Sequence, residues 1–360
     1  MKQKPADQNS LMSPTRRAVL AGIGAAVATP YMWTRARAAR QVRIRTSGRN
    51  VDAVMRPAVW DPFTKETGIE VVNIPATVTK MLATIRAGQP EVDVANAGIE
   101  TLLLAERAGG LLPIDYDKFK FARLADIPAV YRRPYMCGTY QYGTLMAYNK
   151  DSFSTAPNNW AEFWDAGKFP GKRMLQDMSS GRPNLEFALI ADGVDPNKLY
   201  PLDVDRAFAS LNKIRPHIAK FWNTSALANQ MLIDKEVILG SVWNGPLMTA
   251  IGNGAPLAPQ WNQHMISLQS LAVTKGARDP EAAQLLIDFT ATPECQAGMA
   301  KGFGYGPIND KAFAILPEDL LGQTIGSSVL RDKGFLQDDD WWTDNTPMVS
   351  ERWSKWVLER

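Results

Sequence analysis

The chain contains 360 residues, of which 45% are hydrophobic and 21% charged, and it carries a formal net charge of +3. This length is too great for one ordinary hydrophobic core, so we expect a soluble globular protein with two lobes. Two cysteines (Cys137 and Cys295) and two histidines (His217 and His264) argue against a disulfide scaffold and against zinc or iron–sulfur chemistry. Whether the two cysteines pair with each other stays open at this point, because connectivity cannot be deduced from sequence.

The first 39 residues have the layout of an export signal. Arg16 and Arg17 precede an apolar run of small residues from Ala18 to Thr29, and Ala36-x-Ala38 is typical of a cleavage site. The paired arginines resemble the twin-arginine signal, and the apolar run is shorter than the roughly 20 residues that span a bilayer. We predict that residues 1–39 are a twin-arginine signal peptide, cleaved near Ala38 or Ala39, and that the mature protein is periplasmic.

Most of the positive charge lies in this predicted signal. Residues 1–39 contain six basic residues and one acidic residue, so their removal leaves 34 basic and 36 acidic residues, a formal net charge of −2. The predicted mature chain therefore offers no electrostatic reason to bind nucleic acid or an anionic membrane surface.

The first part of the mature chain alternates between strand and helix patterns. Alternating apolar residues predict a first strand that ends at Ser47 and Gly48, and Gly68 is placed to end the helix that follows. Further strands are predicted at 69–74 and 92–95, and further helices at 77–87 and 100–108. This β-α-β-α-β order favours an open, mostly parallel sheet with helices on both faces.

The second part of the chain predicts a second lobe of the same α/β class. Two strand-like segments, 134–149 and 267–273, are candidates for crossings between the lobes. The region between them predicts strands at 173–175 and 237–242 and helices at 185–192, 204–213 and 225–232. A helix follows Asp279 and Pro280, and the chain from Leu316 onward is expected to be helical and aromatic. We predict an N-terminal lobe of 40–139 plus 268–312 and a C-terminal lobe of 140–267 plus 313–360, hinged as a clamshell around a cleft.

Four motifs occur in an order that resembles a known family. They are Trp60-Asp-Pro-Phe-Thr-Lys-Glu-Thr-Gly-Ile69, Trp160-Ala-Glu-Phe-Trp164 with Phe169-Pro-Gly-Lys172, Val242-Trp-Asn-Gly245 and Phe303-Gly-Tyr-Gly-Pro-Ile-Asn309. With them, essentially the whole mature chain resembles the periplasmic solute-binding proteins of ABC importers (extracellular solute-binding protein family 1), most closely the spermidine/putrescine-binding branch. The resemblance implies a type II periplasmic-binding-protein fold, capture of a small solute in the cleft, and delivery to permease subunits in the inner membrane. We expect a monomer without catalytic activity.

The resemblance also implies a ligand site. Trp243 matches the tryptophan that lies against the ligand in polyamine-binding relatives, where an indole face attracts an amine; the alternative is a core tryptophan. Tyr305 matches a late tyrosine near the hinge, and Glu100 could balance an ammonium group or cap a helix. The other residues predicted to bind ligand are Ser47, Gly48, Gly98, Asp177, Ser180, Arg182, Asn244 and Gln269. For Ser47, Gly48 and Asn244, an ordinary turn is the alternative.

The charges of this predicted site differ from those of the polyamine-binding branch. Ser180, Pro183 and Gln269 stand where acidic residues are expected in that branch, and Arg182 would repel a polycation. A guanidinium suits a carboxylate or phosphonate. The sequence therefore favours a zwitterionic amine, such as an opine, an amino-acid derivative or an aminophosphonate, over spermidine or putrescine.

Two rival functions have less support. An iron(III)-binding relative of the same fold would be expected to offer adjacent tyrosines, and the chain contains no Tyr-Tyr pair. An exported hydrolase could use a Ser/His/Asp set, but neither His217 nor His264 lies beside a G-x-S-x-G motif. We therefore predict no catalytic residue, no metal and no cofactor.

Overall fold

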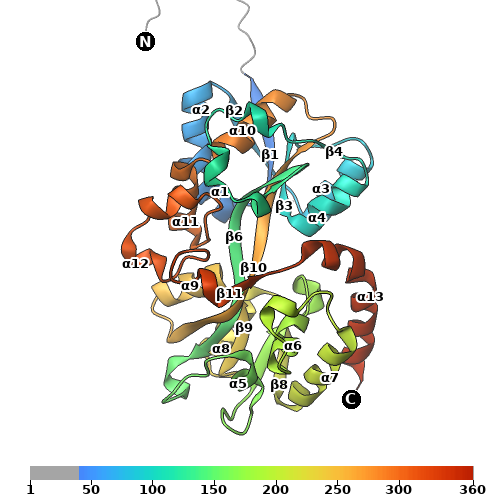
Figure 1. Ribbon diagram of the computed structural model, residues 1–360, viewed down its shortest axis with the longest axis vertical. Helices are drawn as coiled ribbons and strands as arrows, with labels where there is room; N and C mark the ends of the chain where they lie inside the picture. The colour runs from blue at the N-terminus through green and yellow to red at the C-terminus, as the bar shows by residue number, and fades with distance from the viewer. Residues whose placement is uncertain (1–39, 360) are drawn as a thin grey trace, which may run out of the picture. The chain divides into compact units, whose positions relative to one another are not determined.

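The computed structural model of the protein describes residues 40–359 (Figure 1). The predicted signal peptide and its cleavage site lie outside these described residues. At the beginning of the described chain, β1 (Gln41–Thr46) pairs in parallel with β2 (Glu70–Pro75) and with β3 (Val94–Gly98). The predicted parallel order of this region is thereby confirmed, with β3 beginning two residues later than expected.

Local sequence signals explain where the first helices begin and end. α1 (Arg49–Met55), a π-helical turn (Arg56–Trp60) and α2 (Asp61–Thr67) follow one another directly. They end at Gly68, whose φ of 68° is the left-handed conformation that glycine adopts without strain. α3 (Val78–Arg86) begins at Thr77, whose hydroxyl accepts a hydrogen bond from the Lys80 amide at 3.1 Å. α4 (Ile99–Arg107) begins directly after β3.

Two long antiparallel strands run through the middle of the molecule (Figure 1). β6 (Met136–Asn149) and β10 (Leu257–Thr274) contain the predicted segments 134–149, from Met136 onward, and 267–273, although β10 begins ten residues earlier than predicted. They pair from Leu257 opposite Asn149 to Leu271 opposite Cys137. They join the strands of both halves into one mixed sheet of order β2-β1-β3-β10-β6-β9-β7-β8. The α/β class is confirmed, and the sheet is continuous from one half to the other.

The second half of the sheet is built from parallel strands covered by helices. β7 (Arg173–Gln176) lies between β8 (Ile218–Trp222) and β9 (Leu239–Trp243) and is parallel to both. The helices of this region are α5 (Trp160–Trp164), α6 (Leu185–Ala191), α7 (Val204–Ile214), α8 (Ser225–Ile233) and α9 (Asn244–Gly252). The predicted helices 185–192, 204–213 and 225–232 are confirmed to within a residue or two.

The chain after Leu316 is only partly helical, so this prediction was wrong in part. α10 (Pro280–Thr290) and α11 (Pro293–Phe303) precede it, and α12 (Glu318–Leu321) is a single turn. β11 (Gly334–Leu336) then pairs in parallel with β10, and α13 (Asp339–Leu358) ends the described chain. The physical reason is that Gly322 follows α12 directly and Gly326 has a φ of 80°, which a helix cannot accommodate.

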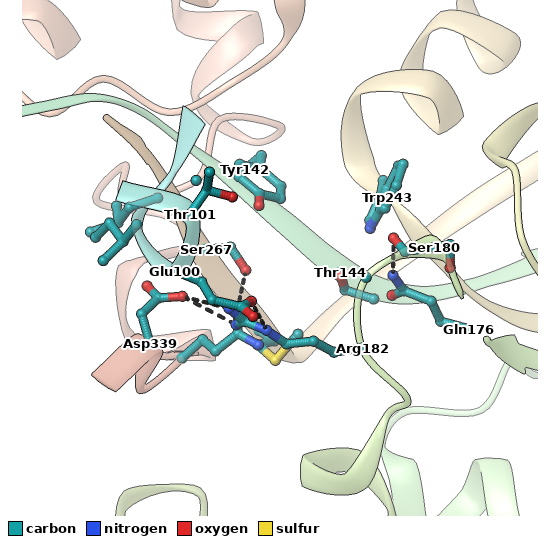
Figure 2. A pocket seen from close by; sticks show the side chains of 16 residues that line it. Glu100, Thr101, Tyr142, Thr144, Gln176, Ser180, Arg182, Trp243, Ser267 and Asp339 are labelled. Atoms are coloured by element: carbon teal, nitrogen blue, oxygen red, sulfur yellow. Dashed lines mark hydrogen bonds and ion pairs between the residues drawn. The ribbon is translucent and has the colours of Figure 1, made fainter. Parts of the chain in front are cut away.

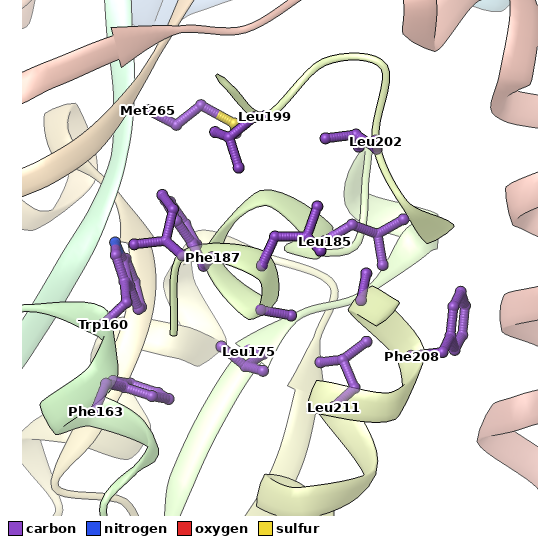
Figure 3. Close-up of a cluster of buried hydrophobic side chains, with 14 of the residues drawn as sticks. Trp160, Phe163, Leu175, Leu185, Phe187, Leu199, Leu202, Phe208, Leu211 and Met265 are labelled. Carbon is purple, nitrogen blue, oxygen red and sulfur yellow. The ribbon is translucent and has the colours of Figure 1, made fainter. Parts of the chain in front are cut away.

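The hydrophobic cores separate along the sheet. In the half that contains β7, Trp160 and Phe187 stack with ring centroids 3.8 Å apart (Figure 3). Trp342 and Trp353 of α13 belong to the same cluster. The half that contains β1 has its own clusters, which include Val42, Phe63, Leu102, Leu271, Leu286 and Met299. Cys137 and Cys295 lie buried in this half as free thiols, which answers the question that the sequence left open.

The two-lobe division remains our proposal, and the cores support it with one adjustment. Phe313, Leu316 and Leu321 pack with Ala297 and Ala300 of α11. The sequence places these three residues in the C-terminal lobe, whereas α11 belongs to the N-terminal lobe. We therefore propose that the last boundary falls after Leu321.

Two features that would indicate a membrane or a metal ion are absent from residues 40–359. Among residues 40–359, no helix combines the length and the apolar character needed to cross a membrane. Within the same range, His, Cys, Asp and Glu side chains do not gather in groups of three that could hold a metal ion.

Candidate ligand-binding site

Two adjoining pockets open where the two halves of the molecule meet. Their volumes are about 210 and 300 Å³, and both are lined by Tyr142, Ser180 and Trp243, so they form one cleft. The first pocket is also lined by Gly98, Glu100, Gln176, Arg182, Ser267 and Asp339 (Figure 2), and the second by Tyr140, Gln269 and Tyr305.

The ends of the parallel strands position most of these side chains. Gly98 ends β3 and precedes Glu100 in the first turn of α4. Arg182 lies in the loop between β7 and α6, and Trp243 is the last residue of β9. In open α/β sheets, ligands bind beyond the carboxyl ends of the strands, so the cleft lies where this topology predicts a ligand.

Arg182 is the centre of a charged cluster at one end of the cleft (Figure 2). Its Nε and Nη2 donate to Oε2 of Glu100 at 3.0 and 2.5 Å, and its Nη1 and Nη2 donate to Oδ1 of Asp339, both at 3.1 Å. The side chains of Arg182 and Asp339 are only 12% and 8% exposed. Because Glu100 comes from the N-terminal half and Arg182 from the C-terminal half, this ion pair crosses the cleft.

Burial and ion pairing change the acidity of these groups in opposite directions. Burial raises the pKa of Asp339 to about 6, although the Arg182 guanidinium acts against this change. Burial alone would lower the pKa of Arg182, but the carboxylates of Asp339 and Glu100 outweigh it and hold that pKa above its usual value. Arg182 is therefore a permanent cation, while Asp339 titrates just below neutral pH.

Aromatic side chains form the other end of the cleft. Tyr140 and Tyr305 stack with ring centroids 4.9 Å apart, and Trp243 meets Trp222 edge to face at 5.3 Å. Burial raises the pKa of Tyr142 to about 12, so this phenol stays neutral at physiological pH. The cleft thus combines a charged end with a neutral aromatic end, a combination that holds a small amphipathic solute.

Seven of the residues predicted to bind ligand line this cleft. They are Gly98, Glu100, Ser180, Arg182, Trp243, Gln269 and Tyr305. Their roles as ligand contacts remain predictions. Gln269 donates to Oδ1 of Asn96 at 2.7 Å, and the Ser180 hydroxyl donates to the carbonyl of Asp177 at 2.9 Å.

The other four predicted residues line neither pocket. Ser47 is exposed at the end of β1, and Gly48, with a φ of 116°, precedes α1. Asp177 caps a short turn by accepting from the Ser179 amide at 2.8 Å. The Asn244 side chain is fully buried: it accepts from the Gly143 amide at 2.9 Å and donates to the Gly304 carbonyl at 2.8 Å.

These contacts give Asp177 and Asn244 structural roles beside the cleft. The Asn244 hydrogen bonds connect the end of β9 to strand β6 and to the turn before Tyr305. The neighbouring Gly245 packs directly against Tyr305, because a Cβ atom at this position would lie 2.6 Å from the phenol ring. Asp177 also accepts a hydrogen bond from the indole of Trp353 at 3.2 Å, which holds the Ser180 loop on α13.

Sequence reasoning missed Tyr142 and Asp339 as residues of the cleft. Tyr140 and Tyr142 are two positions apart on a strand, so period-two alternation placed them on the same side and could have indicated both. Asp339 stands in a run of three aspartates that reads as an ordinary helix start, and only the fold brings this run to Arg182.

Comparisons with known proteins place the chain among its relatives. Residues 58–320 match a family model described as bacterial extracellular solute-binding protein. The chain is 28% identical over 323 residues to the gamma-aminobutyric acid-binding protein of Pseudomonas aeruginosa, covering 86% of this chain and 89% of that one. It is 27% identical over 301 residues to the spermidine/putrescine-binding periplasmic protein of Salmonella typhimurium, covering 80% and 83%. The crystal structure of an ABC transporter substrate-binding protein from Bradyrhizobium japonicum matches with a TM-score of 0.82 at 33% identity, covering 89% and 100%.

Proposed function

The chain belongs to the family of bacterial extracellular solute-binding proteins, and we propose on this premise that it captures a small zwitterionic amine in its cleft for an ABC importer. In this proposal the protein is periplasmic, is exported by the twin-arginine route, and delivers its ligand to permease subunits in the inner membrane as a monomer. It binds its ligand and does not transform it. The curated relatives named above are solute-binding proteins, which supports a binding role.

The observation that best supports a zwitterionic ligand is the ion pair between Arg182 and Glu100 across the cleft. A zwitterion that inserts between Arg182 and Glu100 replaces one ion pair with two, because its carboxylate pairs with Arg182 and its ammonium pairs with Glu100. The net charge of the buried cluster then stays unchanged, and no buried charge loses its partner. A dicarboxylate would meet Glu100 and Asp339 with only one guanidinium to hold it.

The aromatic end of the cleft suits the carbon chain of such a ligand. Methylenes between the two charged groups can lie against Trp243, Tyr142 and Tyr305, where burial of apolar surface adds affinity. The two pocket volumes, about 210 and 300 Å³, fit an amino acid of a few carbons better than a peptide.

A titration experiment tests this function. We expect calorimetry at pH 7.5 to show binding of 4-aminobutanoate. We expect Trp243→Ala to weaken that binding by roughly tenfold or more, because burial of a large apolar side chain contributes about 1.5 to 3 kcal/mol. Trp261→Ala, which removes a half-buried tryptophan outside both pockets, is the matched control. Tight binding of spermidine with no binding of any zwitterion would contradict the proposal.

A polycation is the second candidate, because two carboxylates, Glu100 and Asp339, line the same pocket. Putrescine therefore belongs in the same titration series. Mass spectrometry of the ligand after incubation separates binding from catalysis, since a transport protein returns it unchanged, whereas a hydrolase returns a product.

A further inference from the structure

Asp339 and Glu100 hold Arg182 in different ways, because they come from different halves of the molecule. Asp339 is the first residue of α13, whose start is fixed by Asp338 accepting from the Trp341 amide at 2.9 Å. One turn later, Trp342 lies under Arg182, with the guanidinium carbon 5.3 Å from the ring centroid, and belongs to the core of the C-terminal half. The elements that carry Arg182 and Asp339 therefore pack in the same core, whereas Glu100 reaches Arg182 from α4, across the cleft.

The two carboxylates bind different edges of the Arg182 guanidinium. Asp339 accepts from Nη1 and Nη2, whereas Glu100 accepts from Nε and Nη2. A ligand carboxylate that replaces Glu100 would accept hydrogen bonds from the edge formed by Nε and Nη2, while Asp339 would continue to accept from the edge formed by Nη1 and Nη2. Asp339 thus orients Arg182 and cancels its charge before any ligand arrives.

We propose that Asp339 determines which ligand charge the cleft accepts, by neutralising Arg182 from within the same half of the molecule. This inference rests on the proposed function, because it assumes that ligands enter the cleft beside Arg182. With Asp339 ionised, the Arg182–Asp339 pair is neutral and Glu100 is the remaining charge, so the cleft favours ligands that carry an ammonium. Without that carboxylate, Glu100 is the only anion left to balance Arg182, so the net charge of the cluster rises from −1 to 0 and the preference shifts from ammonium groups toward carboxylates on the ligand.

The charged groups around Asp339 are consistent with this role. Arg182, Arg133 and Glu100 are the groups that act on its carboxyl. Arg133 is engaged by the next residue along the helix, Asp340, at 2.6 Å. Arg182 is therefore the cation that Asp339 compensates, and Asp340 performs a similar task outside the pocket.

Three ligands of similar length and different charge test the proposal: 4-aminobutanoate (net charge 0), glutarate (−2) and putrescine (+2). We expect Asp339→Asn to shift the ratio of glutarate affinity to putrescine affinity toward glutarate by about tenfold or more, because a full charge is removed a few ångströms from the ligand. Glu351→Gln, which removes a carboxylate of the same helix outside the pocket, should leave this ratio unchanged.

A charge-restoring variant separates electrostatics from packing. Asp339→Glu should return the ratio toward that of the wild type, and Asp339→Ser should behave like Asp339→Asn. Thermal melting establishes that each variant is folded. An unchanged ratio in folded Asp339→Asn would overturn the role of Asp339 while leaving the proposed function intact. Wild-type protein that binds putrescine and not 4-aminobutanoate would overturn the zwitterion proposal, while the shift in Asp339→Asn would still support the role of Asp339.

Discussion

At the scale of single residues, the most consequential buried group outside the cleft is Glu186 on α6. It is fully buried, and its Oε1 accepts hydrogen bonds from the Tyr200 hydroxyl at 2.6 Å and the Trp342 indole at 2.7 Å. Its Oε2 has no partner among residues 40–359, and burial raises the pKa of this carboxyl. Glu186 thus connects α6 to the helix that carries Asp339.

Substitutions of Glu186 should separate hydrogen bonding from charge. Glu186→Ala leaves two buried donors unpaired, so we expect a loss of about 3 kcal/mol in the free energy of unfolding. Glu186→Gln keeps an acceptor and should be affected less. Because the pKa of the folded carboxyl lies above its unfolded value, the protonated form is the one that stabilises the fold. Wild-type stability relative to Glu186→Gln should therefore fall as the pH rises from about 4 toward neutrality.

Denaturant unfolding of both variants at several pH values measures these effects. A difference between the wild type and Glu186→Gln that is constant with pH would contradict the raised pKa. Equal losses in the Ala and Gln variants would contradict the role of the two donors.

At the scale of elements, α13, which is labelled in Figure 1, contacts both halves of the molecule. Trp342, Val349, Trp353 and Trp356 lie in the core of the C-terminal half, while acidic residues near its start reach the other half. Asp340 pairs with Arg133 and Asp344 pairs with Arg107 on α4, both at 2.6 Å. Together with Arg182 and Glu100, these pairs connect the two halves on one side of the cleft.

Neutralising these surface pairs should weaken ligand binding in a salt-dependent manner. For the double variant Asp340→Asn/Asp344→Asn, we expect a loss of affinity of a few-fold at low salt that disappears near 0.5 M salt, because such exposed pairs contribute about 1 kcal/mol or less and are screened. Glu351→Gln breaks the Glu351–Lys355 pair within α13 and is the control that should show no effect. A loss that persists at high salt would contradict an electrostatic origin.

The elements also show what a sequence can and cannot predict. The helices and the parallel strands could be predicted from local periodicity and from capping residues, such as Thr77 and Gly68. β8 was missed because Ala219 and Lys220 are exposed in a strand at the end of the sheet, which hides its alternation. The start of β10 and the whole of β11 depend on pairing with distant strands, and Gln263, with a φ of 60°, interrupts the pattern.

For the site, too, contacts between distant positions were the part that the sequence could not predict. Glu100, Arg182 and Trp243 were predicted because the resemblance to the family implied a ligand site there, and all three line the cleft. Asp339 was missed because its contact with Arg182 joins positions 157 residues apart. The sequence also could not predict that Arg182 meets two carboxylates of the protein itself.

At the scale of the whole molecule, the crossing strands make the two halves mutually dependent. β6 contributes Cys137 to one core and Leu145 to another, and β10 likewise contributes Leu271 and Leu257. We expect a single unfolding transition in calorimetry, because neither half retains its core after these strands separate. A ligand at 100 times its dissociation constant should stabilise this single transition by about 2.7 kcal/mol. Two transitions, of which the ligand shifts only one, would contradict this coupling.

The same sharing of strands has a consequence for biosynthesis. The ribosome makes the chain from residue 1 onward, yet the core around Val42 needs Leu286 and Met299. The other core, which begins at Met146, is completed only by Trp353 and Trp356. The chain through Met299 must therefore emerge before the first of these cores can close, and nearly the entire polypeptide before the second can close. The apolar residues of the second core stay exposed until the last helix docks, and an export system that accepts only folded cargo would have to wait for that final step.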